Sequence, residues 1–291
     1  MKSETFSRMN EHCFEERGIS YRTNELVAGR PTLVFIHGAS GSASAWADYE
    51  ELLAERYNIV TYDQRGHGNS RDYRRYADYS LANLSDDLHA LLRHLGDHRY
   101  ILVGHSFGAI VALDYLAAHQ QDLEGVVLLS PDFNVMRHFS AKLIAVALTP
   151  LPLLSYLPSF SRLHGRVDYS RFVNTGDWNF SRSLADLRNT GLRTYLYCIK
   201  QSYALDATDF LRRISVPMLL IHGTADTIFP FRNSVTMRDA IPGASLVEIP
   251  GANHILVLNH PREIADAVSR FADARIPASF VSFEMAKENI G

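Results

Sequence analysis

A strand-like run that ends in Gly104-His105-Ser106-Phe107-Gly108 constrains this chain more than any other feature. The apolar residues 100–103 precede the pentapeptide, and residues 109–113 follow it with the apolar content of a helix. The pattern G-x-S-x-G between a strand and a helix predicts a sharp turn that lifts the serine hydroxyl clear of its own backbone. We expect no room for bulk at either glycine, because strand and helix crowd together at such a turn. Ser106 is therefore the first candidate site residue.

A serine hydroxyl is a weak nucleophile until a base takes its proton and a third group orients that base. The chain supplies both partners in the order serine, acid, histidine that this turn requires. Asp226 and His254 each lie in a loop that follows a short strand-like run. The sequence therefore predicts a catalytic triad of Ser106, Asp226 and His254. Asp132, which follows another such run, is an alternative acid.

Acyl transfer to water is the chemistry that such a triad predicts. Ser106 would attack an ester-like carbonyl, His254 would carry the proton, and Asp226 would hold the histidine tautomer. The oxyanion that forms needs donors, and we expect the backbone N–H groups of Ala39 and Phe107 to supply them. The Phe107 ring either lines the acyl pocket or packs beneath the residues that cover it.

Five motifs occur in the order of one known superfamily: His37-Gly38, residues 63–70, the serine turn, Asp226 with Pro230, and His254 with Pro261. On these motifs the chain resembles the α/β-hydrolase superfamily, as a capped serine esterase or lipase-like member, up to about Arg275. The resemblance implies an α/β fold in which helices flank a mainly parallel central sheet and a helical cap is inserted. It leaves the substrate open, since the superfamily includes esterases, lipases, thioesterases, lactonases and C–C hydrolases. Relatives that use an aspartate nucleophile are disfavoured, because this chain has a serine.

Short apolar runs alternate with amphipathic segments, which is the pattern of a parallel sheet covered by helices. We expect strands at residues 32–36, 58–62, 100–103, 126–129, 218–222 and 246–249. We expect helices at residues 46–56, 81–95, 107–118, 234–240 and 261–271. The motif loops then lie beyond the carboxyl ends of the strands, where ligands bind to such sheets.

The alternation breaks between Asn134 and about Arg213, a stretch longer than a helical crossover needs. We therefore expect residues 134–213 to form the inserted helical cap, here called the cap segment. Residues 1–133 and 214–275 would form the two parts of the core, and residues 276–291 would form a C-terminal tail.

The composition of the cap segment leaves two questions open. It carries eleven Lys and Arg against five Asp, a net charge of +6, so the rest of the chain carries −9. This charge asymmetry has two functional interpretations: it steers anionic substrates, or it holds the cap segment against an acidic body or lipid headgroups. We favour a third interpretation, in which the charges belong to a solvated helical surface with local ion pairs. The apolar stretch from Leu143 to Leu157 also has two interpretations. It lines an acyl pocket or faces lipid in the first, and it packs the cap segment onto the core in the second, which we favour.

Composition excludes other classes of protein. With a net charge of −3, the chain lacks the basic domain or stripe of a nucleic-acid binder. Cys13 and Cys198 predict no disulfide framework, and the first eight residues lack the apolar region of a signal peptide, so we expect cytoplasmic residence. The stretch 143–157 is interrupted by prolines and is too short to span a membrane.

The sequence predicts neither a cofactor nor a metal ion. Hydrolysis by a serine triad needs no cofactor, and the glycine-containing run 66–71 lacks the third glycine of a nucleotide-binding loop. His94 and His98 lie four residues apart without a third ligand in range, so we expect no metal there. His105, beside the serine, is expected to be a packing residue.

The leading functional hypothesis is a cofactor-free hydrolase of carboxylic esters with small to medium apolar acyl groups, lipid-like esters included. An alternative is a hydrolase with the same triad that cleaves a thioester, a lactone or a C–C bond next to a carbonyl. A second alternative is a receptor that uses the pocket of a hydrolase fold. The expected partner is a small-molecule ester, with no nucleic acid and no membrane span, and with lipid contact confined to the cap segment.

Overall fold

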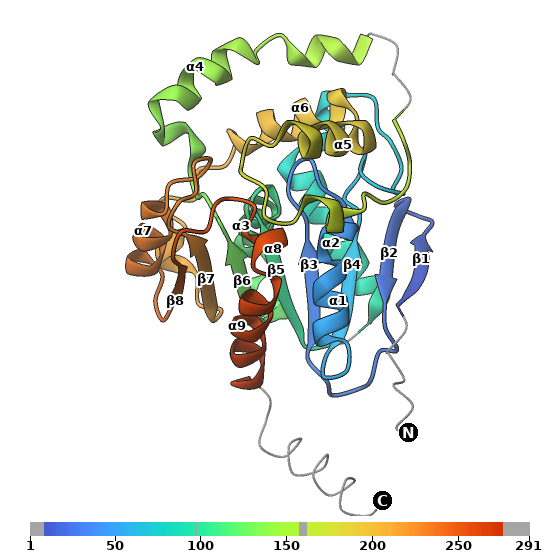
Figure 1. The fold of residues 1–291 in the computed structure, drawn as a ribbon, viewed down its shortest axis with the longest axis vertical. Coiled ribbons are helices and arrows are strands. Elements are labelled where there is room, and N and C mark those ends of the chain that lie inside the picture. Colours follow the sequence, from blue (N-terminus) through green and yellow to red (C-terminus); the bar gives the residue numbers. More distant parts are fainter. Residues whose placement is uncertain (1–8, 97, 157–161, 276–291) are drawn as a thin grey trace, which may run out of the picture.

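An eight-stranded sheet forms the centre of the computed structural model, which describes residues 9–96, 98–156 and 162–275 (Figure 1). The strand order is β1-β2-β4-β3-β5-β6-β7-β8. β2 pairs antiparallel with β1 and with β4, and all the other pairings are parallel. The strands are β1 (Asn10–Phe14), β2 (Ile19–Thr23), β3 (Thr32–Ile36), β4 (Asn58–Tyr62), β5 (Tyr100–His105), β6 (Leu123–Leu129), β7 (Met218–Gly223) and β8 (Ser245–Ile249).

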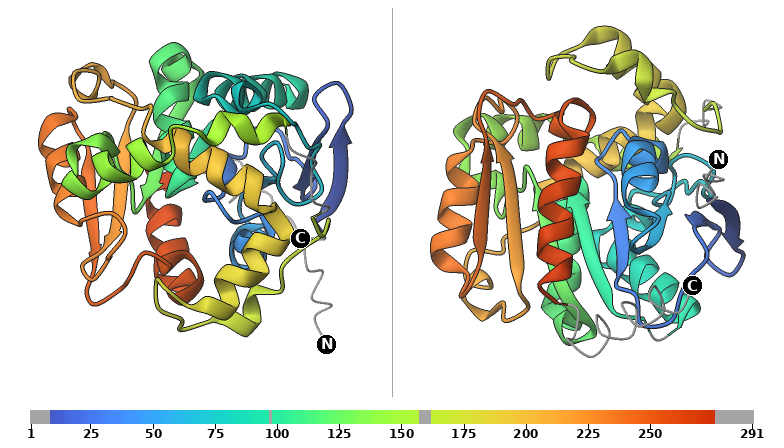
Figure 2. Two further views of the ribbon diagram at one scale, coloured as in Figure 1. Left: turned by 90° about the horizontal axis from the view of Figure 1, so that it is seen from above. Right: turned by 60° about the horizontal axis from the view of Figure 1, so that its bottom comes forward.

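Helices bury both faces of the central strands (Figure 2). Val34 and Leu102 belong to the core on one face, and their chain neighbours Leu33 and Ile101 belong to the core on the other, because successive side chains of a strand point to opposite faces. The first face packs against α2 (Leu81–Leu95), α3 (Phe107–His119) and α7 (Arg232–Ala240), and the second against α1 (Ala47–Leu53) and α9 (Pro261–Asp273). Strands buried on both faces read as continuous apolar runs, which is why the sequence revealed them.

The fold class predicted from the sequence is confirmed, and all six predicted strands and five predicted helices are present with small shifts at their ends. The helix expected at residues 46–56 is shorter, because a 3-10 turn (Ala43–Trp46) precedes α1 and α1 ends at Leu53. The hairpin β1–β2 had no predicted range. Four of the five residues of β1 are exposed, so no apolar run marks this strand in the sequence.

The cap segment lies between β6 and β7, which are neighbours in the sheet. Figure 1 shows α5 and α6 above the central strands and α4 farther out. The elements of the segment are η4 (Val135–Arg137), α4 (Phe139–Ala147), η5 (Leu151–Tyr156), η6 (Tyr169–Phe172), α5 (Phe180–Thr190), α6 (Leu192–Ser202) and η7 (Leu211–Arg213). The domain boundaries themselves stay a prediction.

Two arginines of the cap segment pair with acidic side chains elsewhere in the chain. Arg162 lies 2.6 Å from Asp72 through its Nε atom, and its side chain is almost fully buried. Its terminal nitrogens donate to backbone carbonyls that include those of residues 68 and 70. Arg166 pairs with Glu11. Two of the basic side chains of the cap segment therefore form ion pairs with residues outside it.

The apolar stretch that begins at Leu143 is mostly exposed, so the favoured interpretation that it packs onto the core is wrong. The exposed fractions of Leu143, Val146 and Leu153 are 63%, 72% and 62%. Leu151 is buried, and Leu157 lies outside the described residues. The prediction failed because an apolar run shows that side chains avoid water but does not show which surface covers them.

Within the described ranges, no helix has the length and apolar content needed to cross a bilayer. Cys13 is exposed and Cys198 is buried, and both are free thiols. The predicted tail at residues 276–291 lies outside the described residues.

Candidate active site

Ser106 forms the turn between β5, which ends at His105, and α3, which begins at Phe107. Its backbone angles, φ +54° and ψ −116°, lie in a sparsely populated region for a residue with a side chain. A Cβ atom on Gly104 would lie 2.7 Å from the carbonyl oxygen of Gly108, and one on Gly108 would lie 2.2 Å from that of Ile36. These distances confirm the predicted crowding at both glycines.

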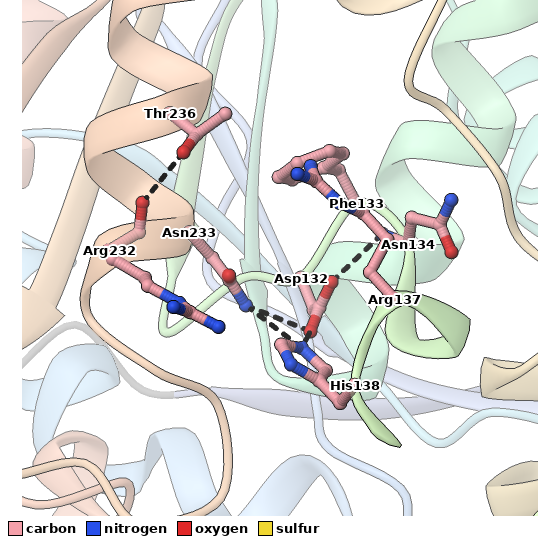
Figure 3. Close-up of a pocket in the computed structure, with 8 residues that line it drawn as sticks. All are labelled: Asp132, Phe133, Asn134, Arg137, His138, Arg232, Asn233 and Thr236. Carbon is pink, nitrogen blue, oxygen red and sulfur yellow. Dashed lines mark hydrogen bonds and ion pairs between the residues drawn. The ribbon is translucent and has the colours of Figure 1, made fainter. Parts of the chain in front are cut away.

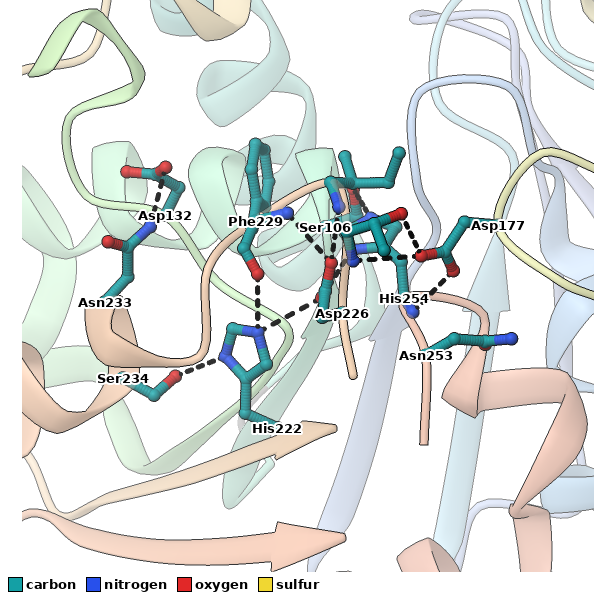
Figure 4. Close-up of polar contacts among 12 residues, drawn as sticks. Ser106, Asp132, Asp177, His222, Asp226, Phe229, Asn233, Ser234, Asn253 and His254 are labelled. Carbon is teal, nitrogen blue, oxygen red and sulfur yellow. Dashed lines mark hydrogen bonds and ion pairs between the residues drawn. The ribbon is translucent and has the colours of Figure 1, made fainter. Parts of the chain in front are cut away.

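The three residues predicted to form the triad lie in one hydrogen-bonded chain (Figure 4). His254 Nε2 lies 2.8 Å from Ser106 Oγ, and His254 Nδ1 lies 2.7 Å from Asp226 Oδ2. A carboxylate only accepts hydrogen bonds, so the Nδ1–H of His254 donates to Asp226. In the neutral ring this leaves Nε2 as the acceptor for the serine hydroxyl, which is the arrangement that a general base requires.

Asp226 is held ionised by its surroundings. Burial alone would raise its pKa, but hydrogen bonds and charge from His222 and His254 lower the pKa well below its ordinary range. Its other oxygen accepts 2.8 Å hydrogen bonds from the backbone N–H groups of Ile228 and Phe229. His222 Nε2 lies 3.1 Å from Asp226 Oδ2, and its Nδ1 lies 2.7 Å from Ser234 Oγ. The carboxylate therefore has a fixed orientation toward His254.

Asp132, the alternative acid, lies in a separate network (Figure 3). Its carboxylate lies 2.8 Å from His138 Nε2 and accepts a 2.9 Å hydrogen bond from Asn233. The network borders a cavity of about 320 Å³ that Arg137 and Arg232 also line. In this geometry Asp226, and not Asp132, is the carboxylate that contacts the imidazole ring of His254.

The two N–H groups predicted to donate to the oxyanion belong to Ala39, which lines the cavity, and to Phe107, which follows Ser106 in the chain. Among the described residues, neither donates a hydrogen bond to a protein acceptor. The first N–H groups of a helix lack intrahelical acceptors, which accounts for Phe107. The loop of Ala39 is held in place, because its carbonyl lies 3.0 Å from His67 Nε2 and the next carbonyl, of Ser40, accepts from Thr190 Oγ1 at 2.7 Å. The Phe107 ring is buried in a core cluster with Val111 and its neighbours, so it packs instead of lining the cavity.

Two buried histidines support the site without contacting the serine hydroxyl. Burial lowers the pKa of His105 to about 3, and its Nε2 lies 2.9 Å from the carbonyl oxygen of His254. Burial also lowers the pKa of His37 to about 4. His37 Nδ1 lies 2.8 Å from the carbonyl of Gly38, and its Nε2 accepts a 3.0 Å hydrogen bond from the N–H of Gln64. Both rings are neutral at neutral pH. His105 is buried, as expected of a packing residue, and it also lines the cavity beside Ser106.

A cavity of about 180 Å³ opens beside Ser106 and His254. The core contributes the loop 38–41 and apolar side chains such as Val257 and Leu258. The cap segment contributes polar groups from Tyr169, Asp177, Arg182, Ser183, Asp186 and Tyr195. Arg182 and Asp186 form a buried ion pair at 3.4 Å. The cap segment also contributes Trp178 and Ile199, so the cavity has both polar and apolar lining groups.

Sequence reasoning missed two residues that contact the site, His222 and Asp177. His222 belongs to the buried strand β7 and reads as part of an apolar run. Asp177 lies in the cap segment, where it accepts a 2.7 Å hydrogen bond from the backbone N–H of His254. No motif or periodicity surrounds Asp177, so only the folded chain reveals the contact.

Metal ligation has one geometric candidate among the described residues, and it is not the pair named from the sequence. His94 stacks on Phe14, and neither His94 nor His98 belongs to the candidate group. The side chains of His89, His119 and Asp122 approach one another, with the two rings stacked at 3.9 Å. His119 belongs to the last turn of α3, whose first turn follows Ser106, so this group is remote from the cavity.

Comparisons with known proteins agree with the fold. A family model described as alpha/beta hydrolase fold matches residues 31–261. An uncharacterized protein of Mycobacterium tuberculosis is 28% identical over 280 residues, which cover 89% of this chain and 81% of that protein. A Pseudomonas syringae protein named "Putative carbamate hydrolase RutD" is 29% identical over 256 residues, which cover 84% of this chain and 94% of that protein. A thermophilic esterase from Thermogutta terrifontis has a similar structure, with a TM-score of 0.68 and 20% identity over 93% of this chain and all of that one.

Proposed function

This chain belongs to the alpha/beta hydrolase fold family, and on that premise we propose that it is a serine hydrolase that cleaves carboxylic esters through an acyl-enzyme. The hydrogen-bonded chain from Ser106 through His254 to Asp226, which opens on a cavity, is the observation that carries the proposal. A receptor would have no need of this alignment, so the geometry favours an enzyme.

In the proposed mechanism, Ser106 Oγ attacks the ester carbonyl while His254 Nε2 takes the hydroxyl proton. The backbone N–H groups of Ala39 and Phe107 donate to the oxyanion that forms, and Asp226 stabilises the imidazolium. His254 then protonates the departing alcohol, which leaves an acyl group on Ser106. Water attacks the acyl-enzyme with His254 again as the base, and the acid product leaves.

The size of the cavity favours substrates with small acyl groups. Its volume of about 180 Å³ is below the roughly 300 Å³ at which pockets for drug-sized ligands begin. Val257 and Leu258 offer an apolar surface to the substrate, while the cap segment offers polar groups. We expect short-chain esters to be the better substrates, and we expect long acyl chains to require displacement of the cap segment.

A carbamate is the second candidate substrate, because the chain is 29% identical to the RutD protein over most of its length. A carbamate carbonyl would meet the same serine and the same donors. Thioesters, lactones and C–C bonds next to a carbonyl remain alternatives for the same residues.

A matched substrate panel tests the proposal. We would measure kcat/KM for p-nitrophenyl acetate, butyrate and octanoate and for the matched N-methylcarbamate, with the Ser106→Ala variant as the control. We expect the acetate or butyrate to be fastest and the variant to lose about 10⁶-fold in turnover. Preference for the carbamate would select the second candidate, and equal rates for Ser106→Ala would overturn both.

A further inference from the structure

Residues 175–178 of the cap segment, here called the latch, lie against the two loops that carry Asp226 and His254. The carboxylate of Asp177 bridges these loops (Figure 4). One oxygen accepts from the N–H of His254 at 2.7 Å. The other accepts from Thr227, through its N–H at 3.0 Å and its hydroxyl at 2.6 Å. The Asp177 side chain, which comes from the cap segment, therefore contacts both His254 and Thr227, the residue that follows Asp226.

Further hydrogen bonds fasten the latch at the same place. The indole Nε1 of Trp178 donates to Thr227 Oγ1 at 3.2 Å. The side-chain amides of Asn253 and Asn259 donate to the carbonyl of Thr175 at 2.9 and 3.0 Å. Both loops thus bind the latch through side-chain and backbone groups, and no interaction in this set reaches Ser106.

The latch is also joined to the loop that carries Ala39. Arg182 of α5 donates to the carbonyl of Asp177 at 2.7 Å. Farther along α5, Asp186 and Thr190 contact Ser40, which follows Ala39, at 3.3 and 2.7 Å. One helix of the cap segment therefore connects the histidine loop with the loop on the other side of the cavity.

The contact between His254 and Asp226 depends on how two separate loops lie relative to each other. These loops follow β7 and β8, and a displacement of about 1 Å in such a site costs roughly 100-fold in rate. On the premise of the proposed function, we propose that Asp177 is a positioning residue that holds the His254 loop against the Asp226 loop. Turnover would then depend on the contacts that the latch makes with these two loops. Both of its carboxylate oxygens accept hydrogen bonds from protein donors, so the positioning role acts through His254, although Asp177 also lines the cavity.

The test compares two substitutions of this residue. In Asp177→Ala, the N–H groups of His254 and Thr227 lose their acceptor, and we expect kcat to fall about 10- to 100-fold while KM changes less than about 3-fold. Asp177→Asn keeps an acceptor for the N–H of His254 but turns an amide group toward Thr227. We expect it to recover part of the loss.

The control is Asp168→Ala. Asp168 is an exposed aspartate of the same cap segment that accepts hydrogen bonds only from Ser170 among the contacts described for it. We expect its kcat to stay within about 2-fold of the wild type. If Asp177→Ala does not fold, Thr227→Val removes the hydroxyl contact from the opposite side of the bridge and should lower kcat in the same direction.

A readout independent of turnover separates positioning from general loss of structure. The proton that His254 Nδ1 shares with Asp226 gives a downfield proton resonance, and we expect it to shift or broaden in Asp177→Ala and to stay unchanged in Asp168→Ala. Unchanged kcat and an unchanged resonance in Asp177→Ala would overturn the positioning role. If wild-type protein hydrolyses no substrate and Ser106 does not react with a fluorophosphonate while the resonance still moves, the proposed function fails and the positioning role stands.

Discussion

Ser106 has a backbone conformation that costs about 1–3 kcal/mol for a residue with a side chain. The neighbouring structure fixes it there, because its N–H donates to Leu129 at 3.0 Å and its carbonyl accepts from Ala109 at 2.9 Å. The hydroxyl is thereby placed at His254 Nε2. Strain at this position is consistent with a reactive residue, and the experiments below test that reactivity.

We expect Ser106, His254 and Asp226, the residues of the hydrogen-bonded chain, to act as a unit in catalysis. Ser106→Ala and His254→Ala should each lower turnover about 10⁶-fold, and the double variant should lose little more, because either change removes the activated nucleophile. Steady-state kinetics on a short-chain ester would measure this. Losses that multiply in the double variant would contradict a shared role.

The identity of the acid gives a second prediction. Asp226→Asn should lower kcat about 10⁴-fold, because the amide no longer holds the tautomer of His254. Asp132→Asn should leave kcat within about 10-fold, since its contacts run to His138 and Asn233. The comparison uses kcat on the same ester, with folding checked by circular dichroism. A larger loss in Asp132→Asn would reverse the assignment.

At the scale of elements, the turn after β5 explains why one pentapeptide predicted so much. Gly104 and Gly108 each face backbone atoms that cannot move aside. The motif therefore indicates close packing of strand and helix at the two glycines as well as a nucleophilic serine between them. The loops of Asp226 and His254 were predictable for a related reason, since buried parallel strands leave apolar runs that end at the site. Asp177 was not predictable, because its partners lie in other loops and nothing local distinguishes it from other polar loop residues.

Gly108→Ala tests the crowding directly. Its Cβ would lie 2.2 Å from the backbone oxygen of Ile36, and we expect a loss of about 3 kcal/mol or more in the free energy of unfolding. Gly176→Ala is the matched control, because no atom lies within 4 Å of the added Cβ, and it should change stability by less than about 0.5 kcal/mol. Urea unfolding measures both. Equal stabilities would refute the packing argument.

The exposed apolar side chains of α4 and η5 carry a further prediction. Leu143, Val146, Leu153 and Tyr156 are all more than half exposed, and exposed apolar side chains of this size favour contact with an apolar surface over open water. If that surface is lipid, sedimentation with phosphatidylcholine vesicles should carry wild-type protein down and should carry down much less of a Val146→Glu, Leu153→Glu variant. Equal sedimentation of the two proteins would exclude lipid contact at this place.

At the scale of the whole molecule, buried histidines link stability to pH. Burial lowers the pKa of His37 to about 4 and that of His67 and His105 to about 3, whereas an unfolded histidine titrates near 6.5. Below pH 6.5 the unfolded chain binds more protons than the folded chain, so the free energy of unfolding falls as the pH falls. His37 alone accounts for about 2 kcal/mol between pH 7 and pH 5.

A His37→Asn variant checks this linkage. It should be less stable than wild type at pH 7, and its stability should decline less steeply between pH 7 and pH 5, by about 0.7 proton on average in the slope. Urea unfolding at several pH values gives both curves. Parallel curves for the two proteins would show that His37 binds protons equally in the folded and unfolded chain, and would contradict a lowered pKa.

Reaction of the native protein with a fluorophosphonate, followed by peptide mapping, tests whether Ser106 is an activated nucleophile. We expect one phosphonyl group per chain on Ser106, much slower labelling in His254→Ala, and none in Ser106→Ala. Absence of labelling in wild-type protein, or labelling at another residue with Ser106 untouched, would contradict this role of Ser106.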